Sequence, residues 1–393
     1  LYLDKERYTD AAETFAAFVA REPTHEASPV LQARVIDAYT LGRFPSLVLK
    51  AKEDYVRYYG LDAEYWIARE LADHPEVVAA LKQNLSDLAG YDHARAQQDS
   101  DTEAYERAAG WYRRYLAYFP EDPDSAQRSF LLAEILNELG RYGEATEQFI
   151  DAAYAYGPHE RAAEAGYAAL LAARAHEAQL EDELLMAWRA RTVEESLRFA
   201  DSFPQHIQAG PVRIKVAEEL FASGQLARAI DVAGLVVTMQ PPVAMELERT
   251  AWRVLGHAQF DLARYAEAEQ AYLRLRQLPA EQPEELAEID SRIAASIYRQ
   301  GEQARDAGEL DVAVAQFLRV RDAVPGDEIV PTAVYDAAAM LMSAQQWDRA
   351  VPVLESFRSS YPKHEFADDV TQNLAVALQS SGRGIEAAAE FER

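Results

Sequence analysis

Histidine and acidic side chains are the residues with which this sequence could bind a metal or move a proton, because the chain contains no cysteine. Glu22 and His25 have the spacing of a di-iron ligand pair on one helix, but Pro23 between them interrupts such a helix. The segment 159–183 carries two histidines and several glutamates, which we interpret as a solvated helix face. None of the eight histidines belongs to an H-E-x-x-H zinc motif. The sequence therefore predicts no metal site and no cofactor.

The motifs of catalysis and phosphate binding are missing or are explained by helix turns. The stretch "GRGIEA" at 382–387 resembles the start of a dinucleotide fingerprint, but it follows an expected helix instead of the strand that the motif requires. No G-x-S-x-G motif and no Walker lysine occurs. The acidic pairs Glu284–Glu285 and Asp368–Asp369 stand at expected helix starts, where the helix dipole favours them. We therefore predict that the chain is not an enzyme.

A recurring frame, typified by "LGRYGEATEQF" at 139–149, indicates the elements that would position any functional side chain. An anchor residue, usually aromatic or leucine, is followed by alanine at +3 and most often by an aromatic residue at +7. These offsets fall on one stripe of an α-helix, where alanine lets a neighbouring helix approach closely. The anchors are Tyr8, Tyr105, Tyr142, Leu226, Tyr265, Leu310, Trp347 and Gly384, and the alanines are Ala11, Ala108, Ala145, Ala229, Ala268, Ala313, Ala350 and Ala387.

Turn residues divide the frame into pairs of helices. A glycine stands two residues before several anchors, as at Gly140, Gly224, Gly308 and Gly382, and predicts a tight turn between two helices. A proline often follows fifteen residues after the anchor, where it ends the helix. Successive anchors from Leu226 onward are 39, 45, 37 and 37 residues apart. A period of this length with two helices per unit is typical of a solenoid.

The frame resembles the tetratricopeptide repeat (TPR), most clearly in "WRVLGHAQFDLARYAEAEQAYLRL". The resemblance implies an all-α, right-handed α-α superhelix of about eight to ten helical hairpins, some of them degenerate. We expect N-terminal TPR-like hairpins with an inserted short helix in 1–100, repeats in 101–205 with a degenerate last one, and regular repeats, truncated at the C-terminus, in 206–393. The residues of that stretch that match the TPR pattern are Trp252, Leu255, Gly256, Tyr265, Ala268 and Tyr272.

TPR domains bind partner segments in the concave groove that their first helices line. In that family the groove residues lie one and two turns into each first helix. The matching positions of this sequence give a set of candidate protein-binding residues. Aromatic, methionine and arginine side chains in an accessible groove suit peptide or helix recognition, although some of them could simply pack between repeats. The candidates are Phe130, Glu134, Asn137, Ile214, Glu218, Phe221, Arg253, His257, Phe260, Tyr298, Glu302, Arg305, Tyr335 and Met342.

The formal net charge of −27 bears on the class of partner. It repels nucleic-acid phosphates and anionic lipid, and no apolar run is long enough to span a membrane. We therefore expect a protein or peptide partner, with no nucleic acid and no membrane insertion of this sequence. A basic partner is one interpretation of the charge, and a solvated exterior that keeps a long array soluble is the simpler one.

Aromatic–proline steps such as "AYFPEDP" and "SSYPKHEF" are similar to those of TPR proteins of the Gram-negative envelope, such as the β-barrel assembly lipoprotein and the Tol-Pal coordinator. This resemblance implies a non-catalytic scaffold of a periplasmic complex, with an outer-membrane anchor in an N-terminal part outside this sequence. Both ends begin or stop within the repeat pattern, so we expect a piece of a larger protein. A cytosolic TPR adaptor or regulator, and the TPR region of a polysaccharide export protein or of a larger enzyme, are the alternatives.

Overall fold

The computed structural model describes residues 6–280 and 282–392, and within them the secondary structure is helical, with no strand. The chain divides into two compact units, unit 1 (Leu1–Phe203) and unit 2 (Pro204–Arg393). Unit 1 holds α1 (Tyr8–Arg21), α2 (Ser28–Leu41), α3 (Pro45–Tyr59), α4 (Pro75–Asp99), α5 (Thr102–Tyr118), α6 (Ser125–Glu138), α7 (Tyr142–Tyr154), α8 (Ala162–Glu177) and α9 (Asp182–Ser202). Unit 2 holds α10 (Ala209–Ala222), α11 (Leu226–Val237), α12 (Met245–Asp261), α13 (Tyr265–Gln277), α14 (Pro283–Asp306), α15 (Leu310–Ala323), α16 (Val330–Ser343), α17 (Trp347–Ser360), α18 (Ala367–Ser380) and α19 (Gly384–Phe391).

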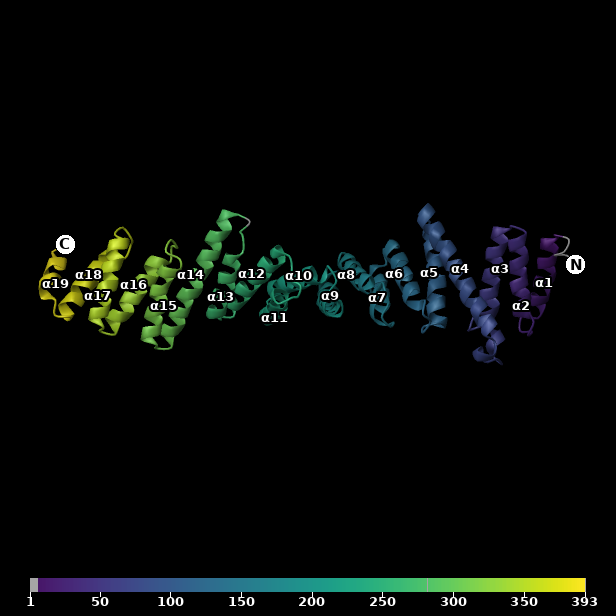
Figure 1. Cartoon of the computed structure of the whole chain (residues 1–393), viewed down its shortest axis with the longest axis horizontal. Helices are drawn as coiled ribbons and strands as arrows, with labels where there is room; N and C mark the ends of the chain where they lie inside the picture. The colour runs from purple at the N-terminus through teal and green to yellow at the C-terminus, as the bar shows by residue number, and fades with distance from the viewer. Residues whose placement is uncertain (1–5, 281, 393) are drawn as a thin grey trace. The chain divides into compact units, whose positions relative to one another are not determined.

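Within each unit every helix packs against the next helix of the chain, as Figure 1 shows. After α1, the described helices form nine hairpins, from α2/α3 to α18/α19. The first helices of successive hairpins also contact each other, as α2 does α4, α10 does α12 and α16 does α18. The predicted fold class, an all-α array of helical hairpins, is confirmed. The contacts are local in sequence, so each hairpin is stabilised mainly by its neighbours.

The second helix of most hairpins begins at the anchor residue predicted from the sequence. Tyr142 opens α7 and Tyr265 opens α13, and the same holds for the anchors of α1, α11, α15, α17 and α19. The predicted +3 alanines of all eight copies are at most 3% exposed, so each one lies against a neighbouring helix. The absence of a larger side chain at +3 therefore sets how closely the helices approach.

The turn before most of the anchors has the same geometry. The backbone of Gly140, Gly224, Gly308 and Gly382 has φ between 70° and 80°, in the left-handed region that glycine adopts without strain. At Gly308 the next residue, Glu309, donates its backbone N–H to the carbonyl of Ala304 at 2.8 Å. This six-to-one hydrogen bond is the Schellman motif that ends α14.

Local chemistry sets the start of two second helices in unit 1. α3 begins at Pro45, because proline is pre-organised for the first helical position. α5 begins three residues before the anchor Tyr105, because the side chain of Asp101 accepts the backbone N–H groups of Glu103 and Ala104 and caps the helix there.

The insertion between α3 and α4 consists of two 3-10 helices, η2 (Glu64–Trp66) and η3 (Leu71–Asp73), in place of the single short helix expected from the sequence. Trp66 is buried and its indole N–H donates to the backbone carbonyl of Tyr59 at 3.0 Å. η2 is therefore packed into the core of unit 1, whereas η3 lies at the surface with no buried residue.

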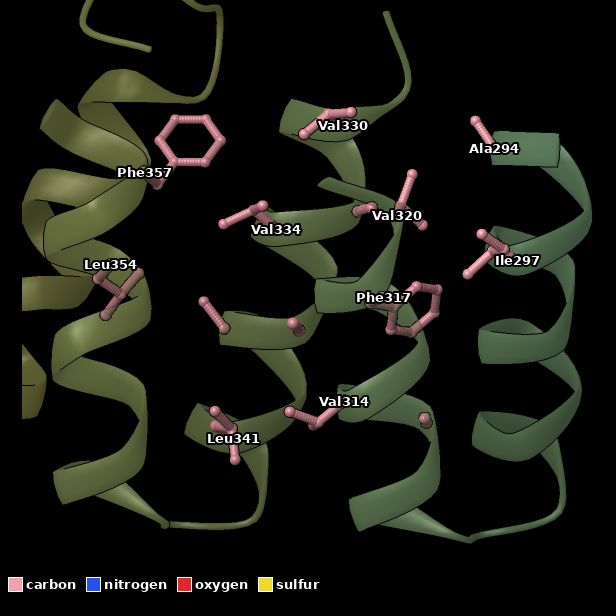
Figure 2. Packing of buried hydrophobic residues seen from close by; sticks show 14 of the residues in the cluster. Ala294, Ile297, Val314, Phe317, Val320, Val330, Val334, Leu341, Leu354 and Phe357 are labelled. Carbon is pink, nitrogen blue, oxygen red and sulfur yellow. The ribbon is translucent and has the colours of Figure 1, made fainter. Parts of the chain in front are cut away.

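Two glycines of first helices show how the aromatic residue at +7 is accommodated. A Cβ atom at Gly256 of α12 would lie 2.6 Å from the ring of Tyr272, and one at Gly301 of α14 would lie 2.7 Å from the ring of Phe317. Each ring is at most 1% exposed and fills the space that the glycine leaves. Figure 2 shows Phe317 among the apolar side chains between α14, α15, α16 and α17.

No described helix combines the length and the apolar character that a membrane crossing requires.

Candidate protein-binding site

Five of the predicted groove residues line two cavities, one in each unit. The cavity of unit 1, here called the acidic cavity, has a volume of about 510 Å³ and is lined mainly by α4, α6 and α8. The cavity of unit 2, here called the arginine cavity, has a volume of about 260 Å³ and lies among α12, α13 and α14. Phe130, Glu134 and Asn137 line the first, and Arg253 and His257 line the second.

The second helices contribute aromatic rings to the wall of the acidic cavity. Phe149, a +7 residue of α7, meets Phe130 of α6 edge to face, with ring centroids 5.4 Å apart. Both rings are almost fully buried, and Tyr105 of α5 is half-buried beside them. This arrangement supplies flat apolar surface under a polar opening, which is typical of small binding pockets.

A buried histidine lines the same cavity from α4. His93 is 8% exposed, and its Nδ1 lies 3.5 Å from the hydroxyl of Tyr112. Burial lowers the pKa of His93, because the charged imidazolium is poorly solvated there. The ring is therefore neutral at pH 7, and it presents one nitrogen that can donate and one that can accept a hydrogen bond.

Three carboxylates, Glu134, Glu138 and Glu164, give the acidic cavity its charge. Burial raises the pKa of Glu134, and its acidic neighbours Glu164 and Glu138 raise it further, whereas Arg161 lowers it. Arg161 forms a two-point ion pair with Glu164 at 2.7 Å and lies 4.0 Å from Glu134. The guanidinium of Arg161 also stands 3.5 Å from the centre of the Phe130 ring. The molecule thus already binds one cation of its own at the margin of the cavity.

The arginine cavity has a different electrostatic composition. Glu285 accepts hydrogen bonds from Arg249 and, at 2.7 Å, from Arg253, and Arg249 is only 2% exposed. Arg292 also lines the cavity, and no ion pair or hydrogen bond of its guanidinium is found in the described part of the chain. The lining therefore combines basic and acidic groups, with Arg292 as its unpaired cation.

His257 connects the arginine cavity to the core of unit 2. Its Nδ1 lies 2.8 Å from the hydroxyl of Tyr272, the ring that fills the space beside Gly256. Burial lowers the pKa of His257, and the nearby Arg292 and Arg253 lower it further against the opposing effect of Glu288. The neutral ring shares one hydrogen bond with the hydroxyl of Tyr272, and the tautomer of His257 decides which of the two donates.

The other predicted groove residues of unit 2 line neither cavity. Ile214 is buried, Glu218 is exposed, and Phe221 is half-buried with its ring 6.1 Å from that of His257. Phe260 packs against Tyr265 with ring centroids 5.1 Å apart.

Further along unit 2, the candidates form intrachain contacts. Tyr298 donates a hydrogen bond to Asp336 at 2.6 Å, Arg305 pairs with Glu302 and Asp306, and Tyr335 stacks on Phe366 at 4.5 Å. Met342 is half-buried. Packing and local ion pairs therefore account for much of this set, the alternative that the sequence left open.

Several lining residues were not predicted from the sequence. Some come from second helices or from first helices in which the frame is degenerate. Glu138, Glu285 and Arg292 lie on regular first helices, but at positions other than those that the repeat register points to. In the described residues, no three side chains of histidine, aspartate or glutamate converge as metal ligands. The residues missed in the acidic cavity are His93, Gln97, Tyr105, Glu138, Phe149, Glu164, Ala168 and Leu171, and those missed in the arginine cavity include Glu285 and Arg292.

The comparisons with known proteins give only distant likenesses to solved structures. No protein-family model and no curated protein matches the chain. Among solved structures, it is similar to the TPR domain of P58(IPK), at 15% identity over 82% of this chain and 90% of that one, with a TM-score of 0.25. It is also similar to the C-terminal part of a TPR repeat-containing protein from Cytophaga hutchinsonii, at 12% identity over 74% and 98% of the two chains, with a TM-score of 0.30. We therefore derive the function from the residues of this chain alone.

Proposed function

We propose that this chain is a non-catalytic, TPR-like scaffold that binds extended or helical segments of partner proteins along the first helices of its hairpins. The acidic cavity carries the proposal, because it is a hollow of about 510 Å³ where the first helices of three successive hairpins come together. Its wall combines buried aromatic rings with polar groups, which is the composition of sites that anchor side chains of a partner.

An exposed leucine at the rim supports the same interpretation. Leu171 of α8 lines the cavity and is 51% exposed, whereas the preceding residue, Leu170, is only 3% exposed. A partner segment seated in the cavity would cover this side chain and remove its apolar surface from water. The proposal therefore expects Leu171 to lie at the partner interface.

Site-specific photo-crosslinking tests this expectation in cells that make the protein. A benzophenone amino acid at position 171 should give a discrete crosslinked product with a partner protein. The matched control is position 235, because Leu235 is 52% exposed but lies on the second helix α11. Equal crosslinking at the two positions, or crosslinking at 235 alone, would contradict binding along the first helices.

We further propose that this scaffold belongs to a bacterial cell-envelope complex and acts in the periplasm. The aromatic–proline steps of the sequence support this location, and the absence of cysteine is compatible with it. Fractionation of cells that express the full-length gene at its native level tests the proposal. We expect the protein in the periplasmic or outer-membrane fraction, and its recovery with cytosolic markers would rule the location out.

A further inference from the structure

We propose that the acidic cavity of unit 1 binds a lysine or arginine side chain of the partner protein. This inference rests on the proposed function and adds the chemistry of the residue that is bound.

The charge of the lining favours a cation. Glu134, Glu138 and Glu164 line the cavity, and none of its lining residues is a lysine or arginine. Glu138 has no ion pair or hydrogen bond within residues 6–280 and 282–392. A bound ammonium or guanidinium group would give Glu138 an opposite charge and would relieve the repulsion among the three carboxylates. The net charge of −27 would also favour the approach of a basic segment.

A buried histidine with one open nitrogen adds an observation independent of the carboxylates. His93 is more than nine-tenths buried and lines the cavity; its Nδ1 lies 3.5 Å from the hydroxyl of Tyr112, and no hydrogen bond of its Nε2 is found in the described chain. Nε2 is not among the fully enclosed atoms that lack a partner, so it is open to the cavity and can bond a group that is bound there. The neutral imidazole can accept an N–H group of a bound cation through the nitrogen that carries no proton.

Neighbouring amides extend this set of acceptors. Gln97 of α4 and Asn137 of α6 line the cavity, and the described structure contains no side-chain hydrogen bond of either. Their amide oxygens can accept further hydrogen bonds from the several N–H donors of a lysine or arginine side chain. Carboxylate, imidazole and amide groups of the cavity can therefore all accept hydrogen bonds from one lysine or arginine side chain.

Arg161 is a cation of the chain itself that is bound by a carboxylate and an aromatic ring beside the cavity. Its guanidinium pairs with Glu164 and stands over the ring of Phe130 at the edge of the cavity. A guest cation would use the equivalent combination, with Glu138 as its ion-pair partner and Tyr105 as its aromatic neighbour.

Selection from a phage-displayed library of random heptapeptides, with the full 393-residue chain as bait, tests the inference. We expect the selected peptides to share a lysine or arginine at one position. A synthetic peptide of the most enriched sequence is then titrated by calorimetry. The E134Q/E138Q variant should bind it about tenfold more weakly or worse, since a charge-assisted hydrogen bond contributes roughly 1.5–3 kcal/mol. Replacement of the shared basic residue by norleucine should cause a similar loss, and the two losses should not add.

The matched control is E13Q/E53Q, which removes the same charge from exposed positions of unit 1 outside the cavity and should change affinity less than about twofold. Circular dichroism melting checks that both variants are folded. Selected peptides without a common basic residue, or equal binding by wild type and E134Q/E138Q, would overturn the inference and leave the proposed function standing. Failure to select any peptide would contradict the proposed function as well. Tight binding of free putrescine without peptide enrichment would show that the ligand of the cavity is a small amine and not a side chain of a partner protein. That result would overturn the inference.

Discussion

At the scale of single residues, the closeness of the helices depends on side chains that are absent. Gly256 and Gly301 leave the space into which Tyr272 and Phe317 fit. The repeat pattern of the sequence pointed to Gly256. The structure shows why glycine is needed there: the ring of Tyr272, sixteen residues later, occupies the space of a Cβ atom. Pattern alone could not show that the ring is fully enclosed and therefore unable to move aside.

Replacement of Gly256 by alanine should destabilise the protein. The added Cβ would lie 2.6 Å from a buried ring, and overpacking of this kind costs about 1–3 kcal/mol, more than the roughly 1 kcal/mol that alanine gains in a helix. G234A in α11 is the control, because nothing lies within 4 Å of its added Cβ. Urea unfolding should show a loss of stability for G256A and a gain for G234A; two gains would contradict the packing described.

The two buried histidines should make stability depend on pH. Burial holds the pKa of His257 and of His93 below the ordinary histidine value of about 6.5, so the unfolded chain takes up their protons first as the pH falls. Their contribution is therefore fully present above about pH 6.5 and is lost as the pH falls toward their folded-state pKa values. Thermal melting between pH 7.5 and 5 should show a smaller loss for H257Q than for wild type, and a still smaller one for H93Q/H257Q. Identical pH slopes in all three proteins would exclude this role.

At the scale of elements, one turn geometry precedes nearly every second helix, including turns that have no glycine. Ala263 and Gln345 adopt φ of 57° at the position that Gly308 takes in the hairpin between them. The carbonyl of Gln259 still accepts the N–H of Arg264 at 2.9 Å, as the Schellman motif requires. The shared backbone is thus imposed by helix packing and not by the residue at the turn.

Glycine should therefore be the better residue at these two turns. A263G and Q345G remove the strain of a left-handed side-chain residue, about 1–2 kcal/mol, and lose part of that gain to the entropy of the unfolded chain. We expect each variant to be more stable by about 0.5–1 kcal/mol in chemical unfolding. The converse change G308A should lower stability, and a stabilising G308A would show that the turn is not strained for other residues.

The elements were largely predictable, and the binding site was predictable only in part. Anchor, alanine and glycine positions repeat at fixed offsets, so they report helix starts and buried faces directly. The cavities depend on which side chains remain without partners after packing, and that depends on neighbours distant in sequence. Phe130 and Asn137 were found because their helix keeps the frame, whereas His93 and Leu171 lie on helices where the frame is weak.

At the scale of the whole molecule, contacts between neighbouring helices determine how a perturbation spreads. The packing of each hairpin involves the preceding and following helices, so the effect of a local defect should fade along the array. Hydrogen exchange of G256A should accelerate in α11 to α14 and remain unchanged in α2 to α5. Acceleration of exchange throughout both units would indicate one cooperative body and would contradict the nearest-neighbour description.

The even spacing of the last hairpins also bears on how such a gene can change. Leu310, Trp347 and Gly384 follow one another at intervals of 37 residues, and each opens a helix after the same left-handed turn. An in-frame duplication of 111 base pairs by unequal crossing-over would insert one complete hairpin and keep both junctions intact. Lengthening of the array by recombination is therefore structurally simple at this end, and paralogues that differ by whole hairpins are the genetic trace that it would leave.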